Sequence, residues 1–157
     1  MKSVMKFFVL MLVSSSLILS GCKKEDDDED VTPTTTYTNV LSAKVDGVAF
    51  SASIPLAQMA MGILQIGGSN AAGSMQVLMA YNVTTGTYSV TDDTDEAIYW
   101  SVGQDSYWPV SGSIVVTKHD VTNNIAEGTF SANLEELSTS APVTISNGVF
   151  KVKYVEQ

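Results

Sequence analysis

A two-residue turn at Asp46-Gly47, set between two alternating segments, is the feature that most constrains the fold of this sequence. Asp-Gly is a preferred pair for the tight turn of a β-hairpin, and such a turn would place Val45 opposite Val48. The apolar residues of both arms then share one face of the hairpin: Leu41, Ala43, Val45, Val48, Phe50 and Ala52. We therefore expect an antiparallel hairpin over residues 41–52, with Gly47 at positive φ.

Alternation with a period of two continues along the chain, whereas no segment of residues 40–157 sustains the period of a helix. Further strands are expected at 61–69, 74–81, 87–91, 97–103, 112–118 and 126–134, and in a last segment over 143–154. In that last segment the apolar parity switches at Asn147-Gly148, which either a hairpin with Gly148 at positive φ or a bulge in one long strand explains. About nine or ten short strands predict an all-β fold, either a single antiparallel β-sandwich or a partly open barrel.

The N-terminal segment resembles the signal peptide of a bacterial lipoprotein. Lys2 and Lys6 make it basic, and the apolar stretch Phe7–Leu19 is shorter than the roughly 20 residues of a membrane span. Leu19-Ser20-Gly21-Cys22 resembles a lipobox, which implies cleavage before Cys22, diacylglycerol on its sulfur and an acyl chain such as palmitate on its amine. Because Cys22 is the only cysteine and lies at the required position, an ordinary secretory signal is the weaker alternative. Residues 1–21 are thus expected to be a signal peptide.

Residues 22–39 are expected to form a lipidated tether ahead of a β domain over residues 40–157. A run of like charges stays extended, and six consecutive acids follow the cysteine: Glu25, Asp26, Asp27, Asp28, Glu29 and Asp30. The threonine-rich residues 31–39 continue the tether. This acidic run shortly after the cysteine resembles the signal by which Bacteroidota-type lipoproteins are exported to the outer face of the outer membrane. We therefore expect a lipid-anchored protein of the outer membrane that faces the cell exterior.

The charge balance argues against a nucleic acid as a partner. The net charge is −9 and the chain has no arginine, so it is poorly suited to bind the phosphates of a nucleic acid. With a single cysteine, the domain has no internal disulfide. The expected partners are the membrane, through the lipid anchor at Cys22, and a glycan or an envelope protein.

Several short motifs, in order, carry a family resemblance. They are Ala43–Phe50, Gly86-Thr87-Tyr88, Ser111–Ile114, Gly128-Thr129-Phe130 and Thr144–Phe150. Together they resemble a β-rich domain family of unknown function found in Bacteroidota lipoproteins, over most of residues 40–155. The resemblance implies a fold class and a location, and it implies no activity or site.

Candidate residues for catalysis or metal binding are few, and we expect no catalytic site, metal or cofactor. His119 is the only histidine, and its neighbour Asp120 is badly placed to orient it because adjacent strand residues point apart. A solvated turn is the preferred interpretation of the acidic loop Asp92–Glu96, with weak calcium binding as the alternative. The four methionines Met59, Met61, Met75 and Met79 are expected in the core.

Two aromatic pairs, Tyr99-Trp100 and Tyr107-Trp108, are the remaining candidates for a binding site. One member of each pair should lie in the core because neighbouring strand residues face opposite ways. Trp100 and Trp108 form a possible ligand platform if both are exposed. The sequence thus favours a non-enzymatic binding or interaction module, with an accessory glycan-capture protein of a polysaccharide-utilisation system or a purely structural lipoprotein as alternatives.

Overall fold

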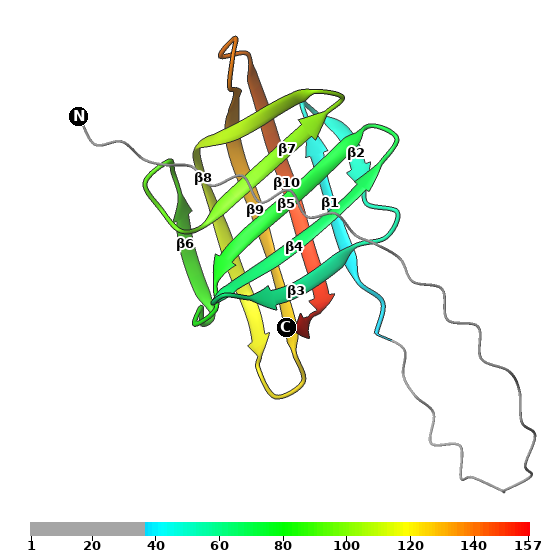
Figure 1. The fold of residues 1–157 in the computed structure, drawn as a ribbon, viewed down its shortest axis with the longest axis vertical. Helices are drawn as coiled ribbons and strands as arrows, with labels where there is room; N and C mark the ends of the chain where they lie inside the picture. The colour runs from blue at the N-terminus through cyan, green and yellow to red at the C-terminus, as the bar shows by residue number, and fades with distance from the viewer. Residues whose placement is uncertain (1–36) are drawn as a thin grey trace, which may run out of the picture. The chain divides into compact units, whose positions relative to one another are not determined.

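The computed structural model describes residues 37–157, which form one curled sheet of eleven strands (Figure 1). The strands are β1 (Val40–Val45), β2 (Val48–Ser51), β3 (Leu56–Ala60), β4 (Ile63–Asn70), β5 (Gly73–Ala80), β6 (Gly86–Val90), β7 (Ala97–Val102), β8 (Asp105–Asp120), β9 (Ile125–Glu136), β10 (Pro142–Lys153) and β11 (Val155–Glu156). Among these residues no helix is long and apolar enough to cross a membrane. The predicted signal peptide 1–21, the lipidation site Cys22 and the acidic run Glu25–Asp30 lie outside the described residues.

Ten of the strands follow one path, in the order β11-β3-β4-β5-β7-β8-β9-β10-β1-β2, and β6 pairs with β8 beside that path. Neighbours run antiparallel except β11, which runs parallel to β3. The path curls into an open half-barrel, so that β3, β4, β5 and β7 cross in front of β8, β9, β10 and β1 (Figure 1). The prediction of an all-β fold is confirmed, and of the two architectures left open by the sequence the structure has the partly open barrel.

Two contacts hold the curled sheet together at its ends. After Lys153 the chain continues from β10 into β11, which reaches β3 at Gln58 and Met59. At the other end, the backbone N–H of Ser53, just after β2, donates to the carbonyl of Ser69 in β4 at 2.9 Å. The ends of the strand path are therefore tied to strands across the curl rather than left free.

The concave side of the sheet holds the hydrophobic core. Every second residue of β9 is buried from Ala126 to Leu134, as the alternating pattern predicts. Aromatic rings fill the centre: Phe50 and Trp100 meet edge to face with centroids 5.2 Å apart. Burial of such large apolar surfaces is the main stabilising contribution to a domain of this kind.

The hairpin predicted at Asp46-Gly47 is confirmed. Asp46 and Gly47 have φ of 48° and 81°, and Val45 lies opposite Val48. Positive φ at both turn residues gives the twist that matches the flanking strands. The phase of the apolar residues across this turn therefore predicted the pairing correctly.

A second tight turn, at Met61-Gly62, was not predicted. Met61 and Gly62 have φ of 50° and 78° and join β3 to β4. The predicted strand 61–69 therefore begins two residues before β4 does. Met61 is 94 % exposed, and its assignment to the core is wrong. The other three methionines, Met59, Met75 and Met79, are buried as expected.

The parity switch at Asn147-Gly148 is a bulge within one long strand, β10. The register of β10 against β9 shifts between Ile145 and Gly148, and it is Asn147 that has positive φ, at 52°. The expectation of positive φ at Gly148 is wrong. Asn147 accepts the left-handed conformation more readily than most residues, and the bulge restores the apolar residues after it to the core face.

The ordered domain begins before residue 40. The Tyr37 hydroxyl donates to the Glu127 carboxylate at 3.3 Å, and burial together with that carboxylate raises the pKa of Tyr37 to about 12. The Asn39 side chain accepts from the backbone N–H of Lys153 at 2.8 Å and donates to the carbonyl of Pro55 at 3.2 Å. These last residues of the expected tether therefore pack on the domain.

Candidate functional site

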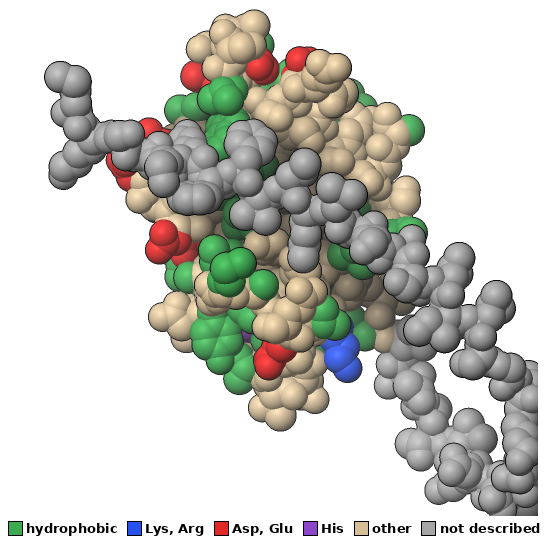
Figure 2. Space-filling model, in the orientation of Figure 1, with side chains coloured by type: hydrophobic (Ala, Val, Ile, Leu, Met, Phe, Trp, Pro, Cys, Tyr) green, Lys and Arg blue, Asp and Glu red, His purple; other side chains and the backbone are tan. Residues whose placement is uncertain are grey.

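The convex side of the sheet carries an uncharged surface over β3, β4 and β5. No charged side chain occurs between Asp46 and Asp92, a segment that contains all of β2 to β6. Where the described residues are visible in Figure 2, tan and green predominate, with few red or blue side chains among them. In a chain of net charge −9 this surface is a distinct neutral region. The sequence reasoning missed it, although the gap between Asp46 and Asp92 is visible in the sequence.

Amides and hydroxyls share the convex positions of these strands with apolar side chains such as Leu56 and Leu78. Gln58 donates to Gln65 across the β3–β4 pair at 3.1 Å, and Gln157 donates to Gln58 at 3.1 Å. Gln76 on β5 is exposed, and Ser69 and Ser74 lie opposite each other two residues beyond it along β4 and β5. The surface thus offers uncharged donors and acceptors.

Tyr99 and Trp108 form an aromatic pair at the edge of this neutral surface. Their ring centroids lie 5.1 Å apart with an interplanar angle of 79°, and both side chains are half-buried. Trp100 and Tyr107, their chain neighbours, pair across β7 and β8 and face the core. Burial raises the pKa of Tyr99. One member of each aromatic pair is therefore in the core, as predicted.

The predicted platform of Trp100 and Trp108 is wrong. Trp100 is only 5 % exposed and packs against Phe50 on the opposite face of the sheet from Trp108. A Cβ atom on Gly73 would lie 2.5 Å from the Trp100 ring, which shows how closely the core encloses it. The partner of Trp108 on the convex face is Tyr99.

The convex residues form a row across five strands in register. Leu56 on β3 lies opposite Gly67 on β4, Gly67 lies opposite Gln76 on β5, and Gln76 lies opposite Tyr99 on β7. Trp108 on β8 extends the row, with Glu135 on β9 beyond it. We call Leu56, Gly67, Gln76, Tyr99 and Trp108 the convex row.

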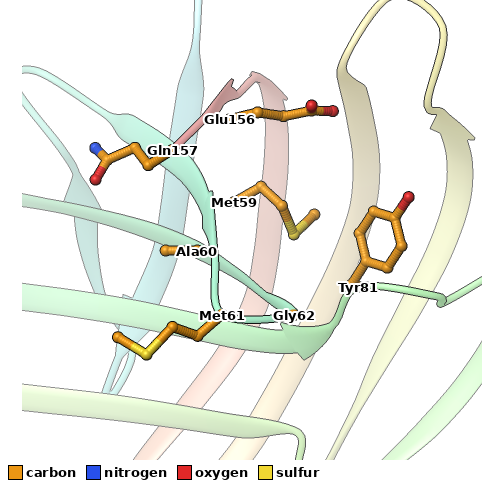
Figure 3. A pocket seen from close by; sticks show the side chains of 7 residues that line it. All are labelled: Met59, Ala60, Met61, Gly62, Tyr81, Glu156 and Gln157. Atoms are coloured by element: carbon orange, nitrogen blue, oxygen red, sulfur yellow. The ribbon is translucent and has the colours of Figure 1, made fainter.

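A separate shallow pocket of about 270 Å³ lies beside the β3–β4 turn (Figure 3). It is lined by Met59, Ala60, Met61, Gly62, Tyr81, Glu156 and Gln157. In Figure 3 the side chains of Met61 and Met59 point in different directions, and Glu156 lies above Met59 with Tyr81 to its right. The polar side chains of the pocket are those of Tyr81, Glu156 and Gln157.

His119 has a structural role in the described part of the chain. Its Nδ1 lies 2.7 Å from the carbonyl of Val83, and its Nε2 lies 3.2 Å from the hydroxyl of Tyr154. Asp120 instead accepts bonds from Thr122 and Asn123 in the following turn. His119 therefore joins the β5–β6 connection to the end of β10, and Asp120 does not orient it. The ring of His119 is half-buried.

The acidic loop Asp92–Glu96 is organised by threonines. The Thr94 hydroxyl accepts from the backbone N–H of Thr91 at 3.0 Å and contacts the carbonyl of Glu96 at 3.1 Å. Within residues 37–157 no three His, Cys, Asp or Glu side chains are grouped so as to hold a metal ion. The loop geometry therefore gives no support to the calcium alternative.

Comparison with known proteins identifies the domain but not its activity. A family model described as a domain of unknown function, DUF6252, matches residues 37–152. No curated protein and no solved structure matches the chain. The match begins at Tyr37, where the contacts with Glu127 also begin.

Proposed function

The chain belongs to the DUF6252 family, and on that premise we propose that it is a cell-envelope lipoprotein whose β domain acts as a non-enzymatic binding module. Its anchor is the lipidated Cys22, and its binding surface is the neutral convex face of β3, β4, β5 and β7. The observation that carries the proposal is the Tyr99–Trp108 pair, which lies on the convex face beside uncharged amides.

The support for the anchor comes from the sequence. The basic start, the short apolar stretch Phe7–Leu19 and the lipobox-like residues 19–22 stand in the order of a lipoprotein signal. The acids Glu25–Asp30 favour export to the outer face of the outer membrane. The tether between Cys22 and Tyr37 then separates the domain from the bilayer surface.

The support for binding comes from the chemistry of the convex face. Aromatic side chains that combine an apolar body with a polar edge are enriched at binding surfaces. Tyr99 and Trp108 form such a pair, although the core of the half-barrel is already filled by other rings. A cross-strand aromatic pair also stabilises a sheet, so a purely structural role would appear as a loss of stability when the pair is truncated.

The support for a non-enzymatic role comes from the only histidine. Both ring nitrogens of His119 contact structural partners, the Val83 carbonyl and the Tyr154 hydroxyl. Burial, followed by the charge of Glu156, raises the pKa of Tyr154, so this phenol stays protonated at neutral pH. Neither group is arranged as the base of a hydrolytic triad.

The anchor is tested by metabolic labelling with an alkyne fatty acid in the native host. We expect label on the wild type and none on Cys22→Ala, because the thioether needs the sulfur. Replacement of Glu25–Asp30 by alanine should keep the label but reduce cleavage by external protease on intact cells. Equal labelling of wild type and Cys22→Ala would contradict the proposed anchor, and equal cleavage would contradict the export signal.

The binding surface is tested by a photo-crosslinking residue at position 76, in the centre of the convex row. The matched control is position 49, where Ala49 is exposed on β2. We expect crosslinked adducts in intact cells from position 76 and not from position 49. Equal yields from the two positions would contradict a specific role for this face.

A further inference from the structure

We propose that the convex row binds an uncharged glycan chain, with Tyr99 and Trp108 holding sugar rings and Gln76 holding their hydroxyls. This inference rests on the proposed function, since it names the ligand class of the same face. The two aromatic side chains and the three residues beside them lie in register across β8, β7, β5, β4 and β3.

The aromatic pair supplies the surface on which a sugar ring can stack. A pyranose has an apolar face of C–H groups and a polar rim of hydroxyls, so it matches an aromatic face that has polar groups at its side. The 79° angle between the Tyr99 and Trp108 rings means that they present differently directed surfaces, which form a corner rather than one flat plane. Such a corner contacts a sugar ring on a face and on an edge.

The amides beside the pair supply neutral hydrogen bonding. Gln76 lies directly opposite Tyr99. The Gln58–Gln65 pair lies two residues from the Leu56–Gly67 pair of the row, along β3 and β4. An amide both donates and accepts, as a sugar hydroxyl does, and neither partner brings a charge. Successive strands lie about 4.8 Å apart, so the row from Trp108 to Leu56 extends over roughly 19 Å, enough for several sugar units.

Gly67 leaves room for a ligand to approach this row closely. It sits inside β4, where glycine weakens a strand, and its φ is not in the left-handed region. A Cβ atom there would lie 3.6 Å from Gln76 Cγ and 3.6 Å from the Met75 carbonyl, which is ordinary contact. Neither the backbone conformation nor the packing requires glycine at this position. The absent side chain leaves the floor of the row open between Leu56 and Gln76.

The charges of the molecule favour a neutral ligand over an acidic one. The chain has a net charge of −9, and Glu135 lies beside Trp108 at one end of the row. No lysine lies on β3, β4, β5 or β7 to pair with a carboxylate or a sulfate of a glycan. An acidic polysaccharide would therefore meet repulsion without compensation.

Affinity electrophoresis of the intact chain in detergent tests the inference. The neutral probes are laminarin, xylan, mannan and soluble starch, and polygalacturonate is the acidic probe. We expect retardation by at least one neutral probe and none by polygalacturonate. Tyr99→Ala and Trp108→Ala should each raise the dissociation constant about tenfold, as expected for the loss of a central aromatic contact.

Two further variants separate a binding role from a structural one. Gly67→Val places a side chain on the floor of the row and should weaken binding without loss of thermal stability, since valine suits a strand. Tyr81→Ala removes an exposed aromatic side chain away from the row and should leave binding unchanged. Thermal melts of all variants show whether each is folded.

The outcomes decide between the glycan inference and the proposed binding face. Failure of all four neutral probes to retard the wild type, or equal retardation of wild type and Trp108→Ala, overturns the glycan inference. If position 76 still gives adducts while position 49 does not, the binding face stands and the glycan inference alone fails. Loss of both signals overturns the face and the glycan together.

Discussion

Phe130 lies opposite Gly148 in the β9–β10 ladder, and its ring fills the space that a side chain on residue 148 would need. A Cβ atom on Gly148 would lie 2.5 Å from Phe130 Cδ2. The same ring stacks on Phe150 with centroids 6.5 Å apart. The glycine of the Asn147-Gly148 pair therefore serves the packing of an aromatic ring, whereas the asparagine carries the positive φ of the bulge.

Gly148→Ala should destabilise the domain by about 1–3 kcal/mol, because the added methyl group overpacks the core against Phe130. Urea unfolding followed by circular dichroism measures this change. In the double variant with Phe130→Leu, the smaller side chain should accept the methyl group, so the two costs should be less than additive. Strict additivity would show that the ring does not limit residue 148.

Gly47→Val should destabilise the domain by about 1–3 kcal/mol for a different reason. Gly47 has φ of 81° and no atom within 4 Å of a Cβ built on it, so the cost arises from the backbone and not from packing. Gly47→Asn should cost less, because asparagine tolerates the left-handed region. Equal stability of Gly47→Val and wild type in urea would contradict the turn geometry.

The two tryptophans should respond differently to truncation. Trp100→Ala should cost about 3–5 kcal/mol because it leaves a cavity beside Phe50. Trp108→Ala, on the convex face, should cost about 1 kcal/mol or less. Thermal melts of the two variants measure the difference, and a larger loss for Trp108→Ala would reverse the assignment of core and surface.

Glu136 should make stability depend on pH in the acid range. Its carboxylate accepts from the backbone N–H groups of Ser138 and Thr139 at 3.0 and 2.6 Å and from both hydroxyls. The hydroxyl of Thr139, the backbone N–H of Ser138 and the other two donors hold the pKa of Glu136 at about 2, below its usual 4.5.

Because the folded pKa is lower, the unfolded chain takes up a proton first as the pH falls. The stabilisation by the Glu136 carboxylate is therefore complete above pH 4.5 and is lost progressively toward pH 2. Glu136→Gln should be less stable than wild type at pH 7, and urea titrations from pH 7 to pH 2 should show the difference shrinking in that window. A constant difference would contradict the assigned role of the carboxylate.

Local pattern was enough to predict the all-β class, the Asp46-Gly47 hairpin and the rule that each aromatic pair divides between core and surface. These features depend on residues close in the sequence: alternation has a period of two, and a two-residue turn fixes the pairing beside it. The pattern did not reveal the Met61-Gly62 turn, because that dipeptide is not a typical turn pair. The early start of β8 at Asp105 was missed as well.

Only the tertiary structure decided which aromatic side chains meet. The convex row depends on pairing between β5 and β7, which are not consecutive, and on the register that places Trp100 opposite Tyr107. A shift of one residue in that register would exchange the rings of core and surface. The bulge at Asn147 depends likewise on a residue from another strand. The Phe130 ring of β9 occupies the space that a side chain on Gly148 would need. Sequence alone thus determined the periodicity of the strands, and long-range packing determined their order, their register and the convex face that results.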